Sequence, residues 1–401
     1  MNLFTNKKAR VYLDWASAAP ISKSVQQLFL DCLTEYGNPS SPHAEGERAR
    51  IMLEDARSTI ARLVEVKPET VLFTSGATEA NAIAIQGHIR ALIAKGKKPD
   101  DLHVLYLPTA HASVIENMKA IAKEGVLIEA LKLGEGAIDL AMLKKQIRPE
   151  TVLVSMDHVC GETGTIYKTR DVRRVLDAVQ NGQEKKGRAR ILLHVDASQA
   201  PLIESIEHTR LGADLLTLDA QKIGGIRGIG ALIRANVQIP LEPLMYGGGQ
   251  EQGMRPGTEN PALAAAFAQA LSEAQKGREV FLEHAREARV FLLEILSKEF
   301  PDMLLNAGKI SAPHILNISF PGRNTDYAVM LFSEAGYAVS TKSACETNEE
   351  GSRAVLILTG DRERAISTLR ISWGPSTRNS ELERFAQELI RTIRFLDMNQ
   401  I

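Results

Sequence analysis

The chain has 401 residues, of which 44% are hydrophobic and 24% charged, and its formal net charge is -1. A chain of this length buries a large core and suits one large domain with a smaller one. Because there is no net positive field, neither nucleic acid nor an anionic membrane is expected as a principal partner. The opening MNLFTNKKAR leads directly into VYLDWASAAP, so we expect no signal peptide, no membrane span and a cytoplasmic location.

The cysteines are isolated and form no CxxC pair; they are Cys32, Cys160 and Cys345. Thiols without close partners in the sequence argue against a disulfide framework and against a thiolate metal site. They favour a reducing compartment, in which a single thiol can still be reactive.

The first part of the chain predicts two helices, over about residues 22–35 and 43–64. The stretch between them, GNPSSP, is expected to break the helix because neither Pro39 nor Pro42 can donate a backbone hydrogen bond. The second helix has a helical period, and its expected buried stripe consists of Ile51, Ile60 and Leu63.

From Val71 onward, apolar runs alternate with helical segments. The runs are VLFT, LHVLYL, VLIEAL, TVLVSM and ILLHVD, and the helices are expected over about 77–95, from 112, over 139–147 and from 170. Such alternation with short connections predicts a mainly parallel sheet with helices on both faces. We expect this large domain to occupy residues 1–260, with residues 1–20 packing on the smaller domain.

The smaller domain is predicted over residues 261–401. Asn260 followed by Pro261 is typical of a helix N-terminus. A helical region over 262–275 and 280–300 would bridge the domains. The runs ILNISF, YAVST and TLRISW then predict strands with helices between and after them.

Two polar residues follow neighbouring apolar runs in the stretch 191–232. Asp196 ends ILLHVD, and Lys222 lies just past LLTLD in a glycine-rich segment. Ligands of open α/β sheets bind beyond the carboxyl ends of such strands. A lysine and an acid placed this way suggest pyridoxal 5'-phosphate (PLP), with the lysine as Schiff base and the acid on the pyridine nitrogen. A solvated lysine beside an ordinary strand-end aspartate is the alternative.

The segment FTSGATEAN reads as a strand end, a glycine turn and a helix start. Such a start can bind an anion, and Thr78 adds a hydroxyl for a phosphate. The alternative is an ordinary helix cap with Glu79 in the first turn. His111, after another strand, could stack on a planar cofactor or be a structural residue, and Gln199 completes the set of strand-end side chains.

Several motifs in one order resemble the cysteine desulfurase family, the NifS/IscS group of fold-type I PLP enzymes. They are LDWASAAP, GNPSSPHAEG, FTSGATEANAIAIQG, HVDASQA, DAQKIGGIRGIGAL, GGGQEQGMRPGTEN, HILNISF, KSAC and LRISWG, and together they cover nearly the whole chain. The resemblance implies the PLP-dependent transferase fold of type I. That fold has a large domain with a mainly parallel, seven-stranded sheet and a smaller α+β C-terminal domain.

The resemblance also implies roles in cofactor binding. Lys222 corresponds to the Schiff-base lysine, Asp196 to the acid on the pyridinium nitrogen, and His111 to the residue stacked on the ring. The remaining positions are Ala77 and Thr78 for the phosphate, Gln199 for the ring hydroxyl, and Thr258 for the phosphate of the neighbouring subunit's cofactor. The last of these implies a homodimer.

The implied substrate is L-cysteine, which would be converted to L-alanine. Arg370 corresponds to the arginine that binds the substrate carboxylate, with Asn38 close to it. Lys222 would take the α-proton, and Cys345 as thiolate would attack the substrate sulfur to form a persulfide. A sulfur-acceptor protein in iron–sulfur cluster assembly or tRNA thiolation would receive that sulfur. Lys342 is a candidate for favouring the Cys345 thiolate.

The chain departs from the family pattern in places that bear on the substrate. Gly161 replaces an asparagine that contacts the ring hydroxyl. Cys160 before it adds a second thiol near the expected ring position, or is a small buried apolar residue. Asp219 and Gln221 replace the serine and histidine before the lysine, and Lys342 replaces a glycine. These changes keep two alternatives open: a related enzyme with a changed substrate, such as a selenocysteine lyase or class V aminotransferase, and a PLP-binding scaffold for sulfur transfer.

Overall fold

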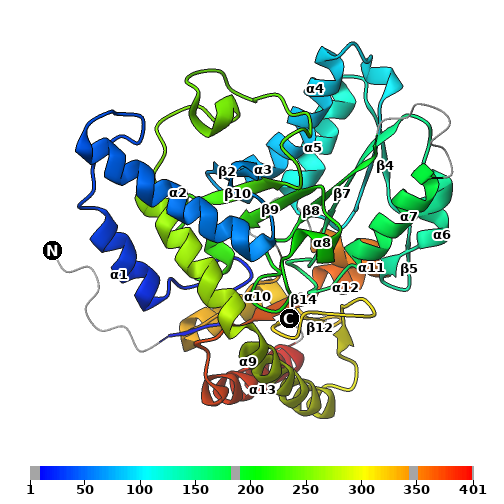
Figure 1. Cartoon of the computed structure of the whole chain (residues 1–401). Helices are drawn as coiled ribbons and strands as arrows, with labels where there is room; N and C mark the ends of the chain where they lie inside the picture. Colours follow the sequence, from blue (N-terminus) through cyan, green and yellow to red (C-terminus); the bar gives the residue numbers. More distant parts are fainter. Residues whose placement is uncertain (1–9, 182–189, 343–350, 400–401) are drawn as a thin grey trace. The chain divides into compact units, whose positions relative to one another are not determined.

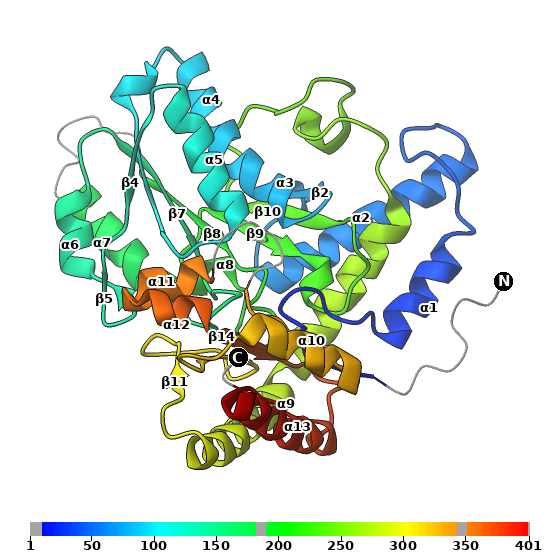
Figure 2. The same cartoon turned by 180° about the vertical axis from the view of Figure 1, so that it is seen from behind.

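The computed structural model describes residues 10–181, 190–342 and 351–399 (Figures 1 and 2). The chain divides into two compact units. We call residues 20–159 and 167–278 the sheet unit, and residues 1–19, 160–166 and 279–401 the terminal unit. The terminal unit therefore combines both ends of the chain with one short internal segment.

A seven-stranded sheet forms the centre of the sheet unit. Its spatial order is β2 (Val71–Thr74), β10 (Gly230–Arg234), β9 (Leu215–Asp219), β8 (Leu192–Asp196), β7 (Thr151–Asp157), β3 (His103–Tyr106) and β4 (Leu127–Ala130). Only β10 runs antiparallel to its neighbours. The predicted mainly parallel sheet is confirmed, whereas β10 was not among the expected strands because its apolar run follows directly on a glycine-rich segment.

The inner strands are buried along their whole length, which is why they read as continuous apolar runs in the sequence. Their register aligns the carboxyl ends: Asp157 lies opposite Asp196, and Asp219 lies opposite Gly230, which in turn faces Thr74. The parallel strands thus present their last residues at one edge of the sheet.

Helices lie on both sides of this sheet (Figures 1 and 2). They are α1 (Lys23–Cys32), α2 (Ala44–Val64), α3 (Ala77–Ala82), α4 (His88–Ala94), α5 (Ala112–Lys123), α6 (Leu140–Gln146), α7 (Thr169–Asn181) and α8 (His208–Leu211). A π-helical turn, Ile83–Gly87, joins α3 to α4, so that the helical backbone continues from Ala77 to Ala94. A small hairpin, β5 (Leu133–Gly134) with β6 (Ala137–Ile138), precedes α6.

Helix α2 shows both a confirmed and a wrong expectation. Its N-terminus is capped by His43, whose Nδ1 accepts from the Gly46 N–H at 3.2 Å. Ile60 is fully buried as predicted, but Ile51 is 54% exposed and does not belong to the buried stripe. The stripe instead uses Leu53 and Ala56, which stand at helical spacing from Ile60.

The terminal unit has a three-stranded antiparallel sheet, β11 (Leu304–Leu305), β12 (Ile315–Ser319) and β14 (Thr368–Ser372). A parallel pair, β1 (Val11–Tyr12) and β13 (Tyr337–Ala338), joins the start of the chain to this unit. Its helices are α10 (Thr325–Ala335), α11 (Arg353–Thr359), α12 (Arg362–Ile366) and α13 (Asn379–Asn399). Figure 2 shows α13 beside the C-terminal part of α9. His284 Nε2 in α9 lies 2.7 Å from Asn379 Oδ1 at the start of α13.

The expected bridging region is a single helix, α9 (Pro261–Glu299), of 39 residues. Asn260 Oδ1 accepts from the Leu263 N–H at 3.0 Å, which confirms the predicted helix start. The division between the units falls inside α9, between Arg278 and Glu279, and residues 261–278 group with the sheet unit. Within the described chain, none of the helices has the length and apolar character needed to cross a membrane.

Candidate functional site

Asp196, at the end of β8, has a carboxylate held in one orientation. The residue is 7% exposed. Its Oδ1 accepts from the Ser198 N–H at 3.0 Å and from Ser198 Oγ at 2.6 Å, and its Oδ2 accepts from Asn81 Nδ2 at 2.7 Å. A buried carboxylate fixed by three donors can hold a positively charged partner in a defined direction.

The same network reaches His111, which caps α5. Asn81 Nδ2 also donates to Ser113 Oγ at 2.8 Å, and that hydroxyl lies 2.8 Å from His111 Nδ1. His111 Nδ1 accepts from the Ser113 backbone N–H at 3.1 Å, so a neutral ring carries its proton on Nε2. The orientation of His111 is therefore coupled to that of Asp196 through two side chains.

A buried histidine lies two residues before Asp196 in β8. His194 Nδ1 is 2.8 Å from Ser155 Oγ and its Nε2 is 3.1 Å from Thr217 Oγ1. Burial lowers the pKa of His194 to about 4, against the opposing effect of Asp196. The imidazole is thus neutral near neutral pH and places no positive charge beneath the Asp196 carboxylate.

Lys222 lies at the end of a single 3-10 turn, Ala220–Lys222, that follows β9. Asp219 fixes this turn because its Oδ1 accepts from the Gln221 N–H at 3.0 Å. Gln199 follows β8, and both Lys222 and Gln199 are partly buried. Because β8 and β9 are adjacent and parallel, Asp196, Gln199 and Lys222 come to the same edge of the sheet.

The start of α3 differs from what its sequence indicated. The Ala77 N–H, which we expected to be available to a phosphate, donates to Asp219 Oδ2 at 3.0 Å. Thr78, the next residue, is exposed. Asp219 itself is 6% exposed, so its carboxylate points into the sheet edge and not into solvent.

Thr258 and Asn38 are exposed residues of loops in the sheet unit. Thr258 borders a cavity of about 220 Å³ that is also lined by Phe73 and Glu251. Asn38 Oδ1 accepts from the Ser40 N–H at 2.9 Å and so closes a turn before α2.

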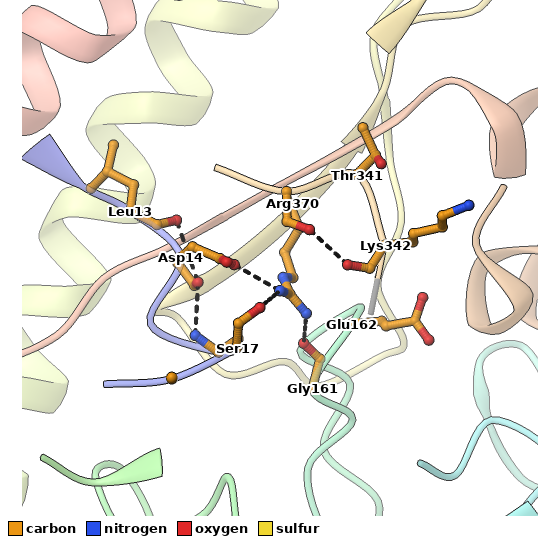
Figure 3. Close-up of polar contacts among 12 residues, drawn as sticks. Leu13, Asp14, Ser17, Gly161, Glu162, Thr341, Lys342 and Arg370 are labelled. Carbon is orange, nitrogen blue, oxygen red and sulfur yellow. Dashed lines mark hydrogen bonds and ion pairs between the residues drawn. The ribbon is translucent and has the colours of Figure 1, made fainter. Parts of the chain in front are cut away.

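Arg370, in β14 of the terminal unit, is 2% exposed and engaged on both ends of its guanidinium (Figure 3). Its Nη2 donates to Asp14 Oδ1 at 2.8 Å and to Ser17 Oγ at 2.7 Å, and its Nη1 donates to the Gly161 carbonyl at 2.9 Å. Its Nε is buried without a hydrogen-bond partner among the described residues. One donor of the fork is thus available to an acceptor.

Gly161 contributes to this cluster through its backbone. No side chain is present to make the contact that the family pattern assigns to an asparagine there, but the carbonyl accepts from Arg370. Cys160, before it, is 2% exposed, and its N–H donates to the Thr165 carbonyl at 2.9 Å. This burial agrees with a small apolar role for Cys160.

Cys345 lies outside the described residues, but both flanks of its segment are anchored in the terminal unit. On the N-terminal side, Ser340 pairs with Arg370 through backbone hydrogen bonds, and Ser340 Oγ donates to the Lys342 carbonyl at 2.7 Å. On the C-terminal side, Ser352 caps α11 and donates to Glu162 Oε2 at 2.6 Å. Ser340, close before that segment in the sequence, therefore lies beside the strand of Arg370.

Sequence reasoning assigned no role to several residues that shape these clusters; they are Asp14, Ser17, Asn81, Ser113 and Ser198. Asn81 stood inside the FTSGATEAN motif, one helical turn after Ala77, and that spacing was an available signal. Asp14 and Ser17 carried no such signal, because their partner lies more than 350 residues away.

The fold and this edge of the sheet define an α/β enzyme with a lysine and a fixed carboxylate at neighbouring strand ends. Residues 11–385 match the aminotransferase class-V family. Cysteine desulfurase IscS of Neisseria meningitidis serogroup C is 35% identical over 392 residues, covering 96% of this chain and 92% of that protein. The chain belongs to the class-V aminotransferase family and, within it, to the cysteine desulfurases.

Solved structures agree with this membership. A NifS-like protein superposes with a TM-score of 0.87 at 27% identity and covers 96% of this chain and 100% of its own. SspA, solved in complex with cysteine, superposes with a TM-score of 0.77 at 26% identity and covers 92% of this chain and 100% of its own.

Proposed function

We propose that this protein is a PLP-dependent cysteine desulfurase that converts L-cysteine to L-alanine and keeps the sulfur as a persulfide on Cys345. The observation that supports this proposal most directly is the fixed Asp196 carboxylate, which ends the strand next to the one that leads to Lys222. The chain also matches cysteine desulfurases over nearly its whole length. The related SspA was solved with cysteine, which supports the same substrate here.

The residues at this edge fit the ring and the aldehyde of PLP. Lys222 suits the aldehyde, and Asp196 suits a protonated pyridine nitrogen because three donors already fix its direction. Asn81 Oδ1 beside them is buried and lacks a hydrogen-bond partner in the described chain. We assign His111 to the ring face and Gln199 to the ring hydroxyl.

The fit to the cofactor phosphate is less complete. Thr78 is an exposed residue at the start of a helix, and its hydroxyl suits a phosphate. Ala77, also assigned to the phosphate, has its N–H bonded to Asp219. We assign Thr258 to the phosphate of the neighbouring subunit in a homodimer.

When bound, PLP supplies an electron sink for bonds at the substrate Cα. Asp196 keeps a proton on the ring nitrogen, and the Lys222 amine accepts the proton that leaves the substrate Cα. The Cys345 thiolate attacks the substrate sulfur: the new S–S bond forms as the substrate C–S bond breaks. Cysteine plus the enzyme thiol thus gives alanine plus an enzyme persulfide, with atoms and electrons balanced.

Arg370 is proposed to bind the substrate carboxylate, with Asn38 close by. Its buried Nε has no hydrogen-bond partner in the described chain, and a carboxylate is the acceptor that a guanidinium fork suits best. Lys342, whose carbonyl is fixed by Ser340, remains a candidate for favouring the Cys345 thiolate.

The remaining assignments concern the setting of the reaction. We propose a cytoplasmic homodimer that hands the persulfide sulfur to an acceptor protein in iron–sulfur cluster assembly or tRNA thiolation. Residues 1–260 would form the PLP-binding domain and residues 261–401 the domain that carries Cys345, with the first 20 residues packing on the latter. A monomeric mass in solution at micromolar concentration would contradict the role given to Thr258.

The test is to add L-cysteine to the purified protein and follow alanine, sulfide and the mass of the Cys345 peptide. We expect alanine together with added sulfur on that peptide, and neither from a Cys345→Ser variant. Lys222→Ala should lose the visible Schiff-base absorbance, and its persistence would refute the cofactor assignment. No alanine and no added sulfur would reject the desulfurase.

A related PLP enzyme with a changed substrate is the second candidate. Gln221 cannot titrate near neutral pH, and Gly161 offers no side chain to a ring, so two family contacts are lost. Alanine from selenocysteine but not from cysteine, or transamination, would favour this candidate. Schiff-base formation without turnover of any amino acid would favour a scaffold.

A further inference from the structure

The most unusual polar contact at the sheet edge joins Asp219 to the start of α3. Both carboxylate oxygens are used: Oδ2 accepts from the Ala77 N–H at 3.0 Å and from Gln221 Nε2 at 3.3 Å, and Oδ1 accepts from the Gln221 N–H at 3.0 Å. All of these donors are amides. The Asp219 charge is therefore stabilised by N–H dipoles and by the helix, and among the described residues no cationic side chain bonds to it directly.

The backbone around this contact leaves little room for rearrangement. Asp219 pairs with Gly230 in the sheet, and a Cβ built on Gly230 would lie 2.8 Å from the Gly76 Cα. A Cβ on Gly76 would meet Asp219 Oδ2 at 3.4 Å. The turn before α3 thus packs tightly on β10, and the Asp219 carboxylate packs against Gly76 in that turn.

The helix that begins at Ala77 is long enough to favour an anion at its start. The α3 segment has six residues, but helical backbone continues through the π turn and α4 to Ala94. The backbone N–H groups of a helix's first turn can bind either a phosphate or a carboxylate. In this chain the protein's own carboxylate already takes the Ala77 N–H.

We propose that Asp219 is a specificity-determining residue that weakens binding of the phosphate group of the cofactor. A phosphate seated near Thr78 must share the start of α3 with a buried negative charge and does so without the Ala77 N–H. Two like charges that share one helix start repel each other, and the repulsion is stronger where water is excluded. The inference rests on the proposed function, because it takes PLP as the ligand of Lys222.

It follows that Asp219 should affect the binding of PLP but not the binding of a ligand that lacks the phosphate. Pyridoxal carries the same aldehyde and ring as PLP but no phosphate, so Asp219 does not oppose it. The difference in affinity between PLP and pyridoxal is therefore small in this chain and grows when the charge at residue 219 is removed.

The experiment titrates the full-length protein with PLP and with pyridoxal and follows the Schiff-base absorbance. For Asp219→Ser we expect the Kd for PLP to fall by about tenfold or more while the Kd for pyridoxal stays unchanged. Asp219→Asn, which keeps one acceptor oxygen for the turn at Gln221, should likewise lower the Kd for PLP and leave the Kd for pyridoxal unchanged. Unfolding midpoints of both variants establish that they are folded.

Asp139→Ser is the matched control, because Asp139 caps α6 with a carboxylate that accepts from Ala141 and Met142 at 2.9 Å each. It should leave both affinities unchanged. Equal tightening of both ligands by Asp219→Ser, no change in either, or weaker PLP binding overturns the proposal. If neither ligand forms a Schiff base with the wild-type protein and the variant does not gain PLP binding, both proposals fail. If PLP binds through Lys222 but the Asp219 variants do not change the ratio of the PLP and pyridoxal affinities, only the proposal about Asp219 fails.

Discussion

Arg370 and Asp14 form an ion pair of 2.8 Å although 356 residues separate them in the sequence. The pair joins the last strand of the terminal unit to the first residues of the described chain. Arg370 is almost fully buried, whereas the Asp14 side chain is 20% exposed. A substrate carboxylate that binds Arg370 therefore meets a guanidinium already oriented, and partly neutralised, by Asp14.

Arg370→Lys should reduce kcat/KM for L-cysteine by about 100-fold or more. An ammonium keeps the charge but cannot replace a planar fork that serves Asp14, Ser17 and Gly161 at once. Steady-state alanine formation gives the value. Arg364→Lys is the control, because Arg364 donates to the Leu305 carbonyl at 2.9 Å in the same unit and is assigned no role in the site. Equal losses from both variants would contradict the assignment.

Asn81→Ala should weaken PLP binding by about tenfold to 100-fold. It removes the bond that fixes Asp196 Oδ2 and the link to Ser113, and a hydrogen bond to a charged group contributes about 1.5–3 kcal/mol. The Kd for PLP and the unfolding midpoint are measured together. Asn117→Ala is the control, since Asn117 donates to the Ser113 carbonyl and does not touch Asp196. A loss of stability without a change in PLP affinity would show that Asn81 has a structural role only.

Glu251→Ala should lower the free energy of unfolding by about 3–5 kcal/mol. Glu251 pairs with Arg57 at 2.7 Å with side-chain exposures of 1% and 8%, so its loss leaves a buried guanidinium without its main counter-charge. Glu54 pairs with the same Arg57 but is 52% exposed, and Glu54→Ala should cost about 1 kcal/mol or less. Denaturant unfolding compares the two variants. Similar losses would mean that burial does not distinguish the two pairs.

Acid should destabilise the protein between about pH 6.5 and pH 4 through its buried histidines. Burial lowers the pKa of His158 and of His194 from the ordinary value of 6.5 to about 4. The unfolded chain therefore binds protons first as the pH falls, and the stability present above pH 6.5 is lost toward pH 4. Each histidine contributes about 3 kcal/mol at most.

Denaturant unfolding at a series of pH values measures this loss. His194→Gln should show a shallower dependence than the wild-type protein over that window, because glutamine does not titrate. His43→Gln is the comparison, since His43 is largely exposed on α2. If the wild-type and His194→Gln curves run parallel, His194 does not account for the acid sensitivity.

Much of the sheet unit was predictable from local pattern. Strands β2, β3, β7 and β8 are apolar runs bounded by turns, and the start of α9 follows from Asn260 and Pro261. The exposure of Ile51 was not predictable, because helical period alone does not say which apolar face meets the core. Strand β10 was missed because glycine at its start masks a strand signal.

The site was predictable in its chemistry and less so in its contacts. Asp196 and Lys222 were both expected at strand ends, and the parallel register of β8 and β9 brings them to one edge. That Asp219 would turn back to the Ala77 N–H could not be read from residues 142 positions apart. Without the tertiary fold, Asp219 was only an unusual residue before a lysine.

The sequence by itself determined the family, the mainly parallel sheet and the residue types at the strand ends, because periodicity and motif order are local properties. Only the tertiary structure decided which of those residues meet. It coupled Asp196 to His111 through Asn81, paired Arg370 with Asp14, and gave the Ala77 N–H to Asp219. The physical reason is that a buried polar group must find its partner wherever the fold brings one, however far away in the chain that partner lies.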